Sequence, residues 1–323
     1  MGDDVSAYAS REDLPGPLVG VDWLASRLGE PGLVVLDASV GAHRGSGRRI
    51  PDARPFDIDG ALSDHSGPLP HTMPDARRFT EELRSLGVHD TDTVVVYDGA
   101  GIYSSPRAWW MLRAMGFDRA AVLDGGLPAW TAAGLPLETA RPAPAAECGD
   151  FTARPRAGRI VGSDEVVAAL ADPAAAVFDA RSGERYSGVV AEPRPGLRAG
   201  HMPGAVNLPF GELQRDGRMR PADELRAVFA ALAGDRQRLF FSCGSGVTAC
   251  VLALGAELAG YREPAVYDGS WSEWGLPSEL PVVTGTGGVG QPRRPGSPHS
   301  CENPEPEQIG VRADGRGRTP LAR

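Results

Sequence analysis

The segment CGSGVTAC, residues 243–250, places a cysteine directly after the apolar run 239–241 and before a stretch with helical spacing. Two glycines, a serine and a threonine follow Cys243, and glycine permits backbone conformations that are closed to other residues. The amides of residues 244–248 can therefore converge on the sulfur, and converging N–H groups at the start of a helix stabilise a thiolate. The pattern predicts a cysteine nucleophile that can carry a charged group. The alternative is a small buried hydrophobic side chain at the end of a strand.

The residues around the cysteines exclude other kinds of cysteine site. A cysteine phosphatase would need an arginine at position 249 to clamp phosphate, and Ala249 stands there. The chain has four cysteines, Cys148, Cys243, Cys250 and Cys301. None belongs to a C-x-x-C pair, and four in a chain of this size do not form a disulfide framework. The sequence therefore predicts free thiols and no metal site.

The composition is that of a soluble globular protein, with 41% hydrophobic and 23% charged residues in a chain of 323 residues. This length is sufficient for two domains. The net charge of −9 and the lack of a basic stripe argue against a nucleic-acid partner. No apolar run approaches the roughly 20 residues of a bilayer span, so we expect no membrane partner. The start MGDDVSAYAS lacks the apolar core of a secretory signal, and we expect a cytoplasmic protein.

The chain contains an internal repeat, which is the strongest indication of its architecture. Apolar runs and turns of the first half recur in the same order in the second half. The matching pairs are LVVLDAS (33–39) with AAVFDAR (175–181), RRIPDARPFDID (48–59) with GHMPGAVNLPF (200–210), VVVYDGAG (94–101) with LFFSCGSG (239–246), and AVLDGGLPAW (121–130) with PAVYDGSWSEW (264–274). Asp98 of the first half stands where the second half has Cys243. The sequence therefore predicts a duplicated domain with one inactive and one active copy.

Each half alternates short apolar runs with amphipathic stretches, which predicts an α/β fold with a mainly parallel sheet flanked by helices. In the second half the patterns predict helices at 163–172 and 222–234, and strands at 175–181, 205–210, 239–243 and 265–270. Cys243 then lies at the carboxyl end of a parallel strand, which is where open α/β folds bind their ligands.

The domain limits follow from the repeat and from two changes in composition. We expect an N-terminal domain at 15–137 and a C-terminal catalytic domain at 158–283. Residues 138–157 are rich in proline, alanine and arginine, which indicates a linker. Residues 284–323 contain too few apolar side chains to offset the entropy of ordering, so we expect a disordered tail.

The segments CGSGVTAC, YDGSWSEW, HMPGAVNLPF, FDID and YSSPRAWWMLRAMG together resemble the tandem-domain rhodanese family, and within it the branch that uses 3-mercaptopyruvate. The resemblance covers residues 15–282 and implies two tandem rhodanese-like domains. It implies that Cys243 takes a sulfane sulfur from a small-molecule donor, becomes a persulfide and passes the sulfur on.

The resemblance also implies the reactants. The donor would be 3-mercaptopyruvate, which leaves as pyruvate, and the acceptor a thiol, such as that of a thioredoxin-like protein, or cyanide. No metal or organic cofactor is implied. The alternative is a thiosulfate:cyanide sulfurtransferase. That branch of the family carries Arg and Lys in the two positions after its cysteine, where this chain has Gly244 and Ser245.

The resemblance also implies which residues bind the substrate, by their positions in the matching segments. Arg185 and Arg194 match two family arginines that hold the carboxylate and keto group of the substrate, a role that suits the planar guanidinium. The loop residues expected around the substrate are Gly244, Gly246, Val247 and Thr248.

The mercaptopyruvate branch also has a serine two residues after its cysteine, with a histidine and an aspartate from the inactive domain. Ser245 matches the serine. Asp59 of FDID and His71 of LPHTMP are the best matches for the other two, although one extra residue separates them. His65 and Asp64 of SDHSG are the competing pair. Such a relay could polarise the substrate and move its proton.

Overall fold

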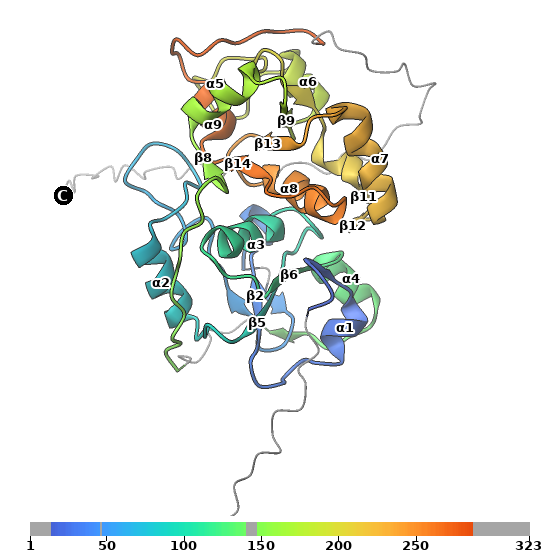
Figure 1. Cartoon of the computed structure of the whole chain (residues 1–323). Coiled ribbons are helices and arrows are strands. Elements are labelled where there is room, and N and C mark those ends of the chain that lie inside the picture. Colours follow the sequence, from blue (N-terminus) through green and yellow to red (C-terminus); the bar gives the residue numbers. More distant parts are fainter. Residues whose placement is uncertain (1–13, 46, 140–146, 287–323) are drawn as a thin grey trace, which may run out of the picture.

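The computed structural model describes residues 14–45, 47–139 and 147–286, which form two α/β domains stacked on each other (Figure 1). The first domain contains five parallel strands in the order β1-β6-β5-β2-β4. Their bounds are β1 Leu18–Val19, β2 Leu33–Asp37, β4 Arg54–Pro55, β5 Thr93–Tyr97 and β6 Ala120–Leu123. The helices of this domain are α1 Val21–Ala25, the 3-10 turn η1 Gly41–His43, α2 Ala76–Ser85, α3 Ser105–Ala114 and α4 Gly126–Ala132.

The second domain repeats this arrangement, with five parallel strands in the order β10-β9-β13-β14-β8. Their bounds are β8 Ile160–Val161, β9 Ala175–Asp179, β10 Val206–Asn207, β13 Arg238–Ser242 and β14 Ala265–Tyr267. The helices are α5 Ser163–Ala171, α6 Gly183–Ser187, the 3-10 turn η2 Phe210–Leu213, α7 Ala222–Ala233, α8 Ala249–Leu258 and α9 Ser270–Trp274. The prediction of two domains with parallel sheets flanked by helices is confirmed.

The strands are apolar on both faces because each sheet is covered on both sides. In β13, Leu239 and Phe241 pack into the same core as α7 and α8, whereas Phe240 packs into a separate core with residues of α5 and α9. Successive side chains of a strand point to opposite faces, so a continuous apolar run is what a doubly covered strand requires. The first sheet shows the same alternation between Val95 and Val96.

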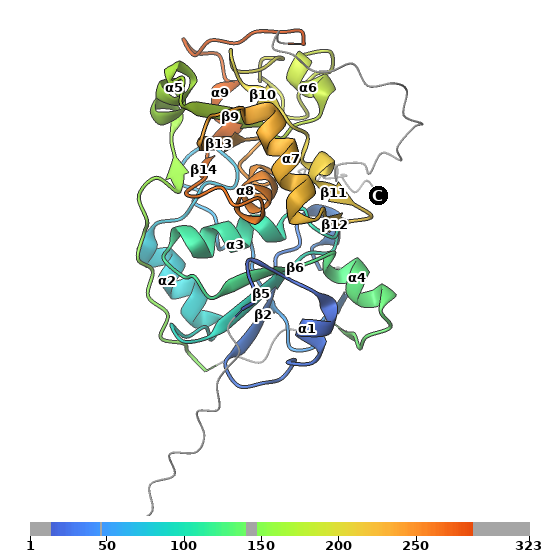
Figure 2. The same ribbon diagram turned by 45° about the vertical axis from the view of Figure 1, so that its right-hand side comes forward.

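The two domains share one core through α3 and α8, which lie against each other between the sheets (Figure 2). In α3 every residue except Arg113 is buried, including Trp109 and Trp110. A helix that is apolar around most of its circumference belongs in the interior. The domain interface is therefore as apolar as a domain core, and it fixes the first domain against the second.

Two short antiparallel ladders complete the described fold. One is a hairpin of the second domain, β11 Gln214–Arg215 with β12 Arg218–Met219. The other joins β3 Arg48–Arg49 to β7 Glu138–Thr139. Among the described residues, the helices include none that is both long and apolar enough to cross a membrane.

The segment expected as a linker is partly integrated into the first domain. Its first two residues form β7, residues 140–146 lie outside the described part, and Phe151 is buried against Phe79 of α2. The N–H of Gly149 donates to the carbonyl of Arg84. One buried aromatic side chain and several backbone hydrogen bonds thus anchor a stretch whose composition indicates a linker. At the other end, Gly285 still donates to the carbonyl of Ser187, and the remainder of the expected tail, 287–323, lies outside the described residues.

Candidate active site

Cys243 follows β13 and begins the loop that leads into α8, at the carboxyl end of the second sheet. Its side chain is only 2% exposed. The backbone around it is held by α9, because Ser270 Oγ accepts the Cys243 N–H at 3.1 Å and Trp271 N–H donates to the Cys243 carbonyl at 2.9 Å. Ser272 N–H likewise donates to the Gly244 carbonyl at 2.8 Å. The loop that carries the thiol is therefore fixed to a second element before any ligand binds.

The loop needs glycine at position 246. Gly246 has a φ of +78°, and a Cβ there would lie 2.9 Å from the carbonyl oxygen of Asp268. Val247 and Thr248 continue the loop into the first turn of α8 and are nearly buried, as is Ser245. The predicted substrate-binding loop residues thus form one compact turn next to the sulfur.

The equivalent loop of the first domain closes around a carboxylate instead of a thiol. Asp98 follows β5 as Cys243 follows β13, and it is 1% exposed. Four backbone N–H groups donate to its carboxylate over 2.8–3.0 Å, those of Ala100, Tyr103, Ser104 and Ser105. A loop at this place in the fold can therefore direct several N–H groups at one anion. In the first domain, the group that these N–H groups bind is the Asp98 side chain itself.

His71 joins the two domains at the site. Its Nδ1 lies 2.8 Å from Oγ of Ser245, and its Nε2 lies 3.1 Å from Oδ1 of Asp59. The hydrogen bond from His71 lowers the pKa of Asp59 below its usual value, and partial burial opposes this shift. The competing residues stay in their own loop, because His65 Nε2 contacts the carbonyl of Gly60 and Asp64 accepts from Ser66.

Arg185 and Arg194 both lie beside Gly244. A Cβ at position 244 would be 3.2 Å from Nη2 of Arg185 and 3.8 Å from Nη1 of Arg194. Nη1 of Arg194 also donates to Oγ of Ser272 at 3.2 Å. Two guanidinium groups from the segment 185–194 thus supply the positive charge that the cysteine loop itself lacks.

Sequence reasoning missed Glu192, which lies between these two arginines in the chain. Its side chain is 2% exposed, and it accepts from Arg185 Nη2 at 2.6 Å and from Arg181 Nη1 at 2.7 Å. Arg181 in turn pairs with Asp179 at 2.6 Å and stacks on Trp271 at 3.9 Å from its centroid. Glu192 therefore connects Arg185 to a buried network. An acidic residue in a polar loop gives no sequence signal for such burial.

The remaining thiol near the site is inaccessible. Cys250 lies in the first turn of α8, is fully buried and donates to the carbonyl of Gly246 at 3.2 Å. Burial raises the pKa of Cys250 to about 12, so its thiol stays protonated at neutral pH. Its environment is that of a structural side chain.

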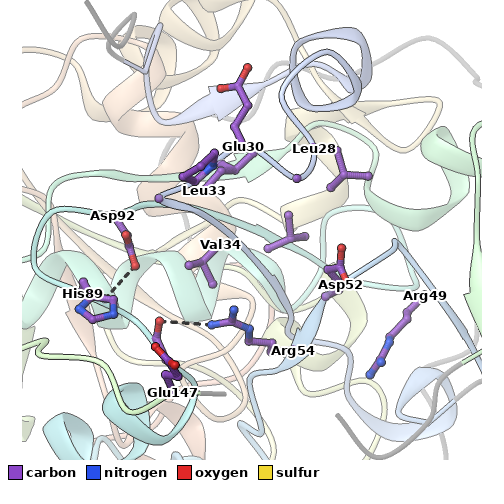
Figure 3. Close-up of a pocket in the computed structure, with 16 residues that line it drawn as sticks. Leu28, Glu30, Leu33, Val34, Arg49, Asp52, Arg54, His89, Asp92 and Glu147 are labelled. Atoms are coloured by element: carbon purple, nitrogen blue, oxygen red, sulfur yellow. Dashed lines mark hydrogen bonds between the residues drawn. The ribbon is translucent and has the colours of Figure 1, made fainter. Parts of the chain in front are cut away.

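A pocket of 480 Å³ lies elsewhere, at the amino ends of β2 and β5 in the first domain (Figure 3). Three of its charged side chains have partners within the domain. Arg49 pairs with Glu138 at 2.6 Å, Arg54 donates to the carbonyl of Gly87, and Asp92 accepts the His89 N–H. Cys243 lies at the carboxyl end of the other sheet, so this pocket has no part in the chemistry of the thiol.

Comparison with known proteins agrees with the duplicated fold. The model of the rhodanese-like domain matches the chain twice, at residues 20–133 and 163–276. The chain is 40% identical to the 3-mercaptopyruvate sulfurtransferase of Escherichia coli strain K12, over 82% of this chain and 96% of that protein. It is 36% identical to the mitochondrial thiosulfate/3-mercaptopyruvate sulfurtransferase 1 of Arabidopsis thaliana, over 82% of this chain and 78% of that protein. The crystal structure of SseA from Escherichia coli matches with a TM-score of 0.71 and 38% identity, over 80% of this chain and 100% of that one.

Proposed function

Because this chain belongs to the rhodanese family, we propose that it is a sulfurtransferase that takes sulfur from 3-mercaptopyruvate and releases pyruvate. The observation that carries the proposal is the hydrogen-bonded series Asp59–His71–Ser245 two residues from Cys243. It supports a donor whose departure needs a proton. Relatives named 3-mercaptopyruvate sulfurtransferase, which match nearly their whole length, support the same donor.

Substrate binding would use Arg185 and Arg194. Both guanidinium groups lie beside Gly244, which supports a pose with the substrate carboxylate and keto oxygen on the arginines and the substrate sulfur toward Cys243. A planar guanidinium binds a carboxylate through two parallel hydrogen bonds, which also fixes its orientation. Mercaptopyruvate carries its charge at the end opposite its sulfur, so this arrangement suits it.

The transfer itself is a displacement at sulfur. The Cys243 thiolate forms a bond to the sulfur of mercaptopyruvate while the carbon–sulfur bond breaks, and its electron pair remains on the carbon as the enolate of pyruvate. The enolate takes up a proton and leaves as pyruvate. Ser245 would donate to the oxygen on which negative charge develops, and His71, oriented by Asp59, would return the proton. The loop amides of Gly244, Gly246, Val247 and Thr248 would stabilise the Cys243 persulfide.

The second half-reaction regenerates the thiol. A thiolate acceptor, or cyanide, attacks the outer sulfur of the persulfide and carries it away as a persulfide or thiocyanate. The low exposure of Cys243 supports an acceptor that is small or that presents its thiol on a protruding segment, such as a thioredoxin-like protein in the cytoplasm.

The proposal is tested by mass spectrometry and by kinetics. Incubation with mercaptopyruvate should increase the intact mass by one sulfur atom, and Cys243→Ser should abolish both this shift and turnover. Cys250→Ser is the matched control, because its thiol is buried and protonated. Turnover in Cys243→Ser would refute the proposed nucleophile. A kcat/KM that favours thiosulfate over mercaptopyruvate would replace the proposed donor by that of the alternative activity.

A further inference from the structure

Two aspartates at matching places in the repeat connect the domains reciprocally. Asp124 follows β6 and Asp268 follows β14. Oδ1 of Asp124 accepts the N–H of Met219 from the second domain at 3.0 Å, and Oδ2 of Asp268 accepts the N–H of Met73 from the first domain at 2.7 Å. Each domain therefore extends a loop that is anchored beside the strand end of the other.

The two aspartates differ in how deeply the arginine that pairs with each of them is buried. Asp124 lies 3.5 Å from Nη1 of Arg218, whose side chain is 42% exposed. Asp268 accepts from Nη2 of Arg107 at 2.7 Å, and the Arg107 side chain is 0% exposed. A buried guanidinium is costly unless a carboxylate compensates it, so the Arg107–Asp268 pair depends on both partners. The exposed pair is energetically minor by comparison.

The buried pair holds the segment that carries His71. Nη2 of Arg107 donates to the carbonyl of His71 at 2.7 Å, while Asp268 accepts from Met73 two residues later. His71 has a φ of +59°, a left-handed conformation that is unfavourable for a residue other than glycine. Such a conformation persists where its surroundings impose it. Arg107 and Asp268 hold the backbone that directly follows this conformation, at the His71 carbonyl and the Met73 N–H.

Arg107 also touches the loop of the nucleophile. A Cβ at position 246 would lie 3.2 Å from its Nη1, and Asp268 provides the carbonyl on the other side of Gly246. One ion pair thus borders both the His71 segment and the cysteine loop. We propose that Arg107 and Asp268 are positioning residues, which set the placement of His71 relative to Ser245 and thereby the rate of sulfur transfer. This inference rests on the proposed function, in which His71 moves the proton.

The variant that tests the inference is Asp268→Asn, with Asp124→Asn as matched control. Asparagine keeps the shape of aspartate but has a single acceptor oxygen, so it can accept from either the Met73 N–H or Arg107. Its NH2 group would then face the remaining donor, and that hydrogen bond is lost. We expect kcat with mercaptopyruvate to fall at least about tenfold, because small displacements of a proton-transfer group are costly. KM should stay within about twofold, because Arg185 and Arg194 are untouched. Asp124→Asn should leave kcat within about twofold.

A double variant separates positioning from a general structural role. In a His71→Ala background, Asp268→Asn should cause no further loss of kcat, because the group that it positions is gone. Equal losses in Asp268→Asn and Asp124→Asn, or a full additional loss in the His71→Ala background, would overturn the inference. Arg107→Lys is a second variant that keeps the buried charge. It should lower kcat in the same way, and an unchanged kcat would exclude Arg107 as a positioning residue.

Amide hydrogen exchange provides a readout that does not depend on turnover. Exchange at residues 71–73 should accelerate in Asp268→Asn and not in Asp124→Asn, and exchange at residues 218–219 should show the reverse. Unchanged exchange at 71–73 in Asp268→Asn would refute the anchoring. Absence of turnover in the wild-type enzyme would instead refute the proposed function, and the exchange result would then decide the anchoring alone.

Discussion

Nδ1 of His71 lies 2.8 Å from Oγ of Ser245, although the two residues are 174 positions apart and belong to different domains. The histidine comes from the copy that lacks the cysteine, and the serine from the copy that has it. Under the proposed function, the domain without the cysteine therefore completes the site of the domain that has it. This contact adds to the apolar interface that α3 and α8 form between the domains.

Ser245→Ala should distinguish the two donors. Pyruvate leaves mercaptopyruvate as an enolate, on whose oxygen negative charge develops and which then needs a proton, whereas sulfite leaves thiosulfate without needing a proton. We expect kcat with mercaptopyruvate to fall about a hundredfold, the usual size of the loss of one donor to a developing oxyanion, and kcat with thiosulfate to change by less than about threefold. The measurement is steady-state kinetics with both donors. A parallel loss with both donors would mean that Ser245 supports the loop instead of stabilising the enolate oxygen.

His71→Ala should reproduce the kinetics of Ser245→Ala, and His65→Ala should not. His71 contacts Ser245 and Asp59, whereas the contact found for His65 is with the carbonyl of Gly60 in its own loop. The two single variants are compared in the mercaptopyruvate assay. A larger loss in His65→Ala than in His71→Ala would reverse the assignment of the relay.

Glu192→Gln should weaken substrate binding. The neutral amide no longer holds Arg185 and Arg181 with a full charge, so Arg185 loses part of its orientation beside Gly244. We expect KM for mercaptopyruvate to rise roughly tenfold, which corresponds to about 1.4 kcal/mol of binding free energy. Glu184→Gln, at an exposed position one residue before Arg185, is the control and should leave KM unchanged. A lower KM in Glu192→Gln would show that the carboxylate competes with the substrate for Arg185.

Asp59→Asn should lower the free energy of unfolding in a way that depends on pH. The pKa of Asp59 is held below 3.8, chiefly by the hydrogen bond from His71, with partial burial acting in the opposite direction. A carboxyl group with a depressed folded-state pKa stabilises the fold above its unfolded pKa, and this contribution is lost as the pH falls through the folded pKa. The wild type should therefore exceed Asp59→Asn in stability near neutral pH, and the difference should shrink below about pH 3.8.

Denaturant titrations at a series of pH values measure this difference. The exposed Asp164 offers a control, because Asp164→Asn should change stability little at any pH. A difference between wild type and Asp59→Asn that persists unchanged at the acid end would show that the substitution acts by another route.

Much of the fold was predictable because its signals are local. The repeated apolar runs and turns predicted two α/β domains, and the parallel sheets around β5 and β13 confirm them. The segment 138–157 was harder, since its composition indicates a linker while the buried Phe151 and several backbone hydrogen bonds tie it to the first domain. Composition averages over a window and cannot register individual anchoring contacts.

The thiol loop could be identified from the amino-acid sequence, because strand, cysteine, glycines and helix lie within a few consecutive residues. The contact of Ser245 with His71 instead of His65, and the burial of Glu192 and Arg107 beside the site, are visible only in the folded protein. These relations depend on how two domains meet, and the burial of a charged side chain is set by partners distant in sequence. Because hydrogen bonds require distances of about 3 Å, spacing along the chain cannot substitute for that geometry.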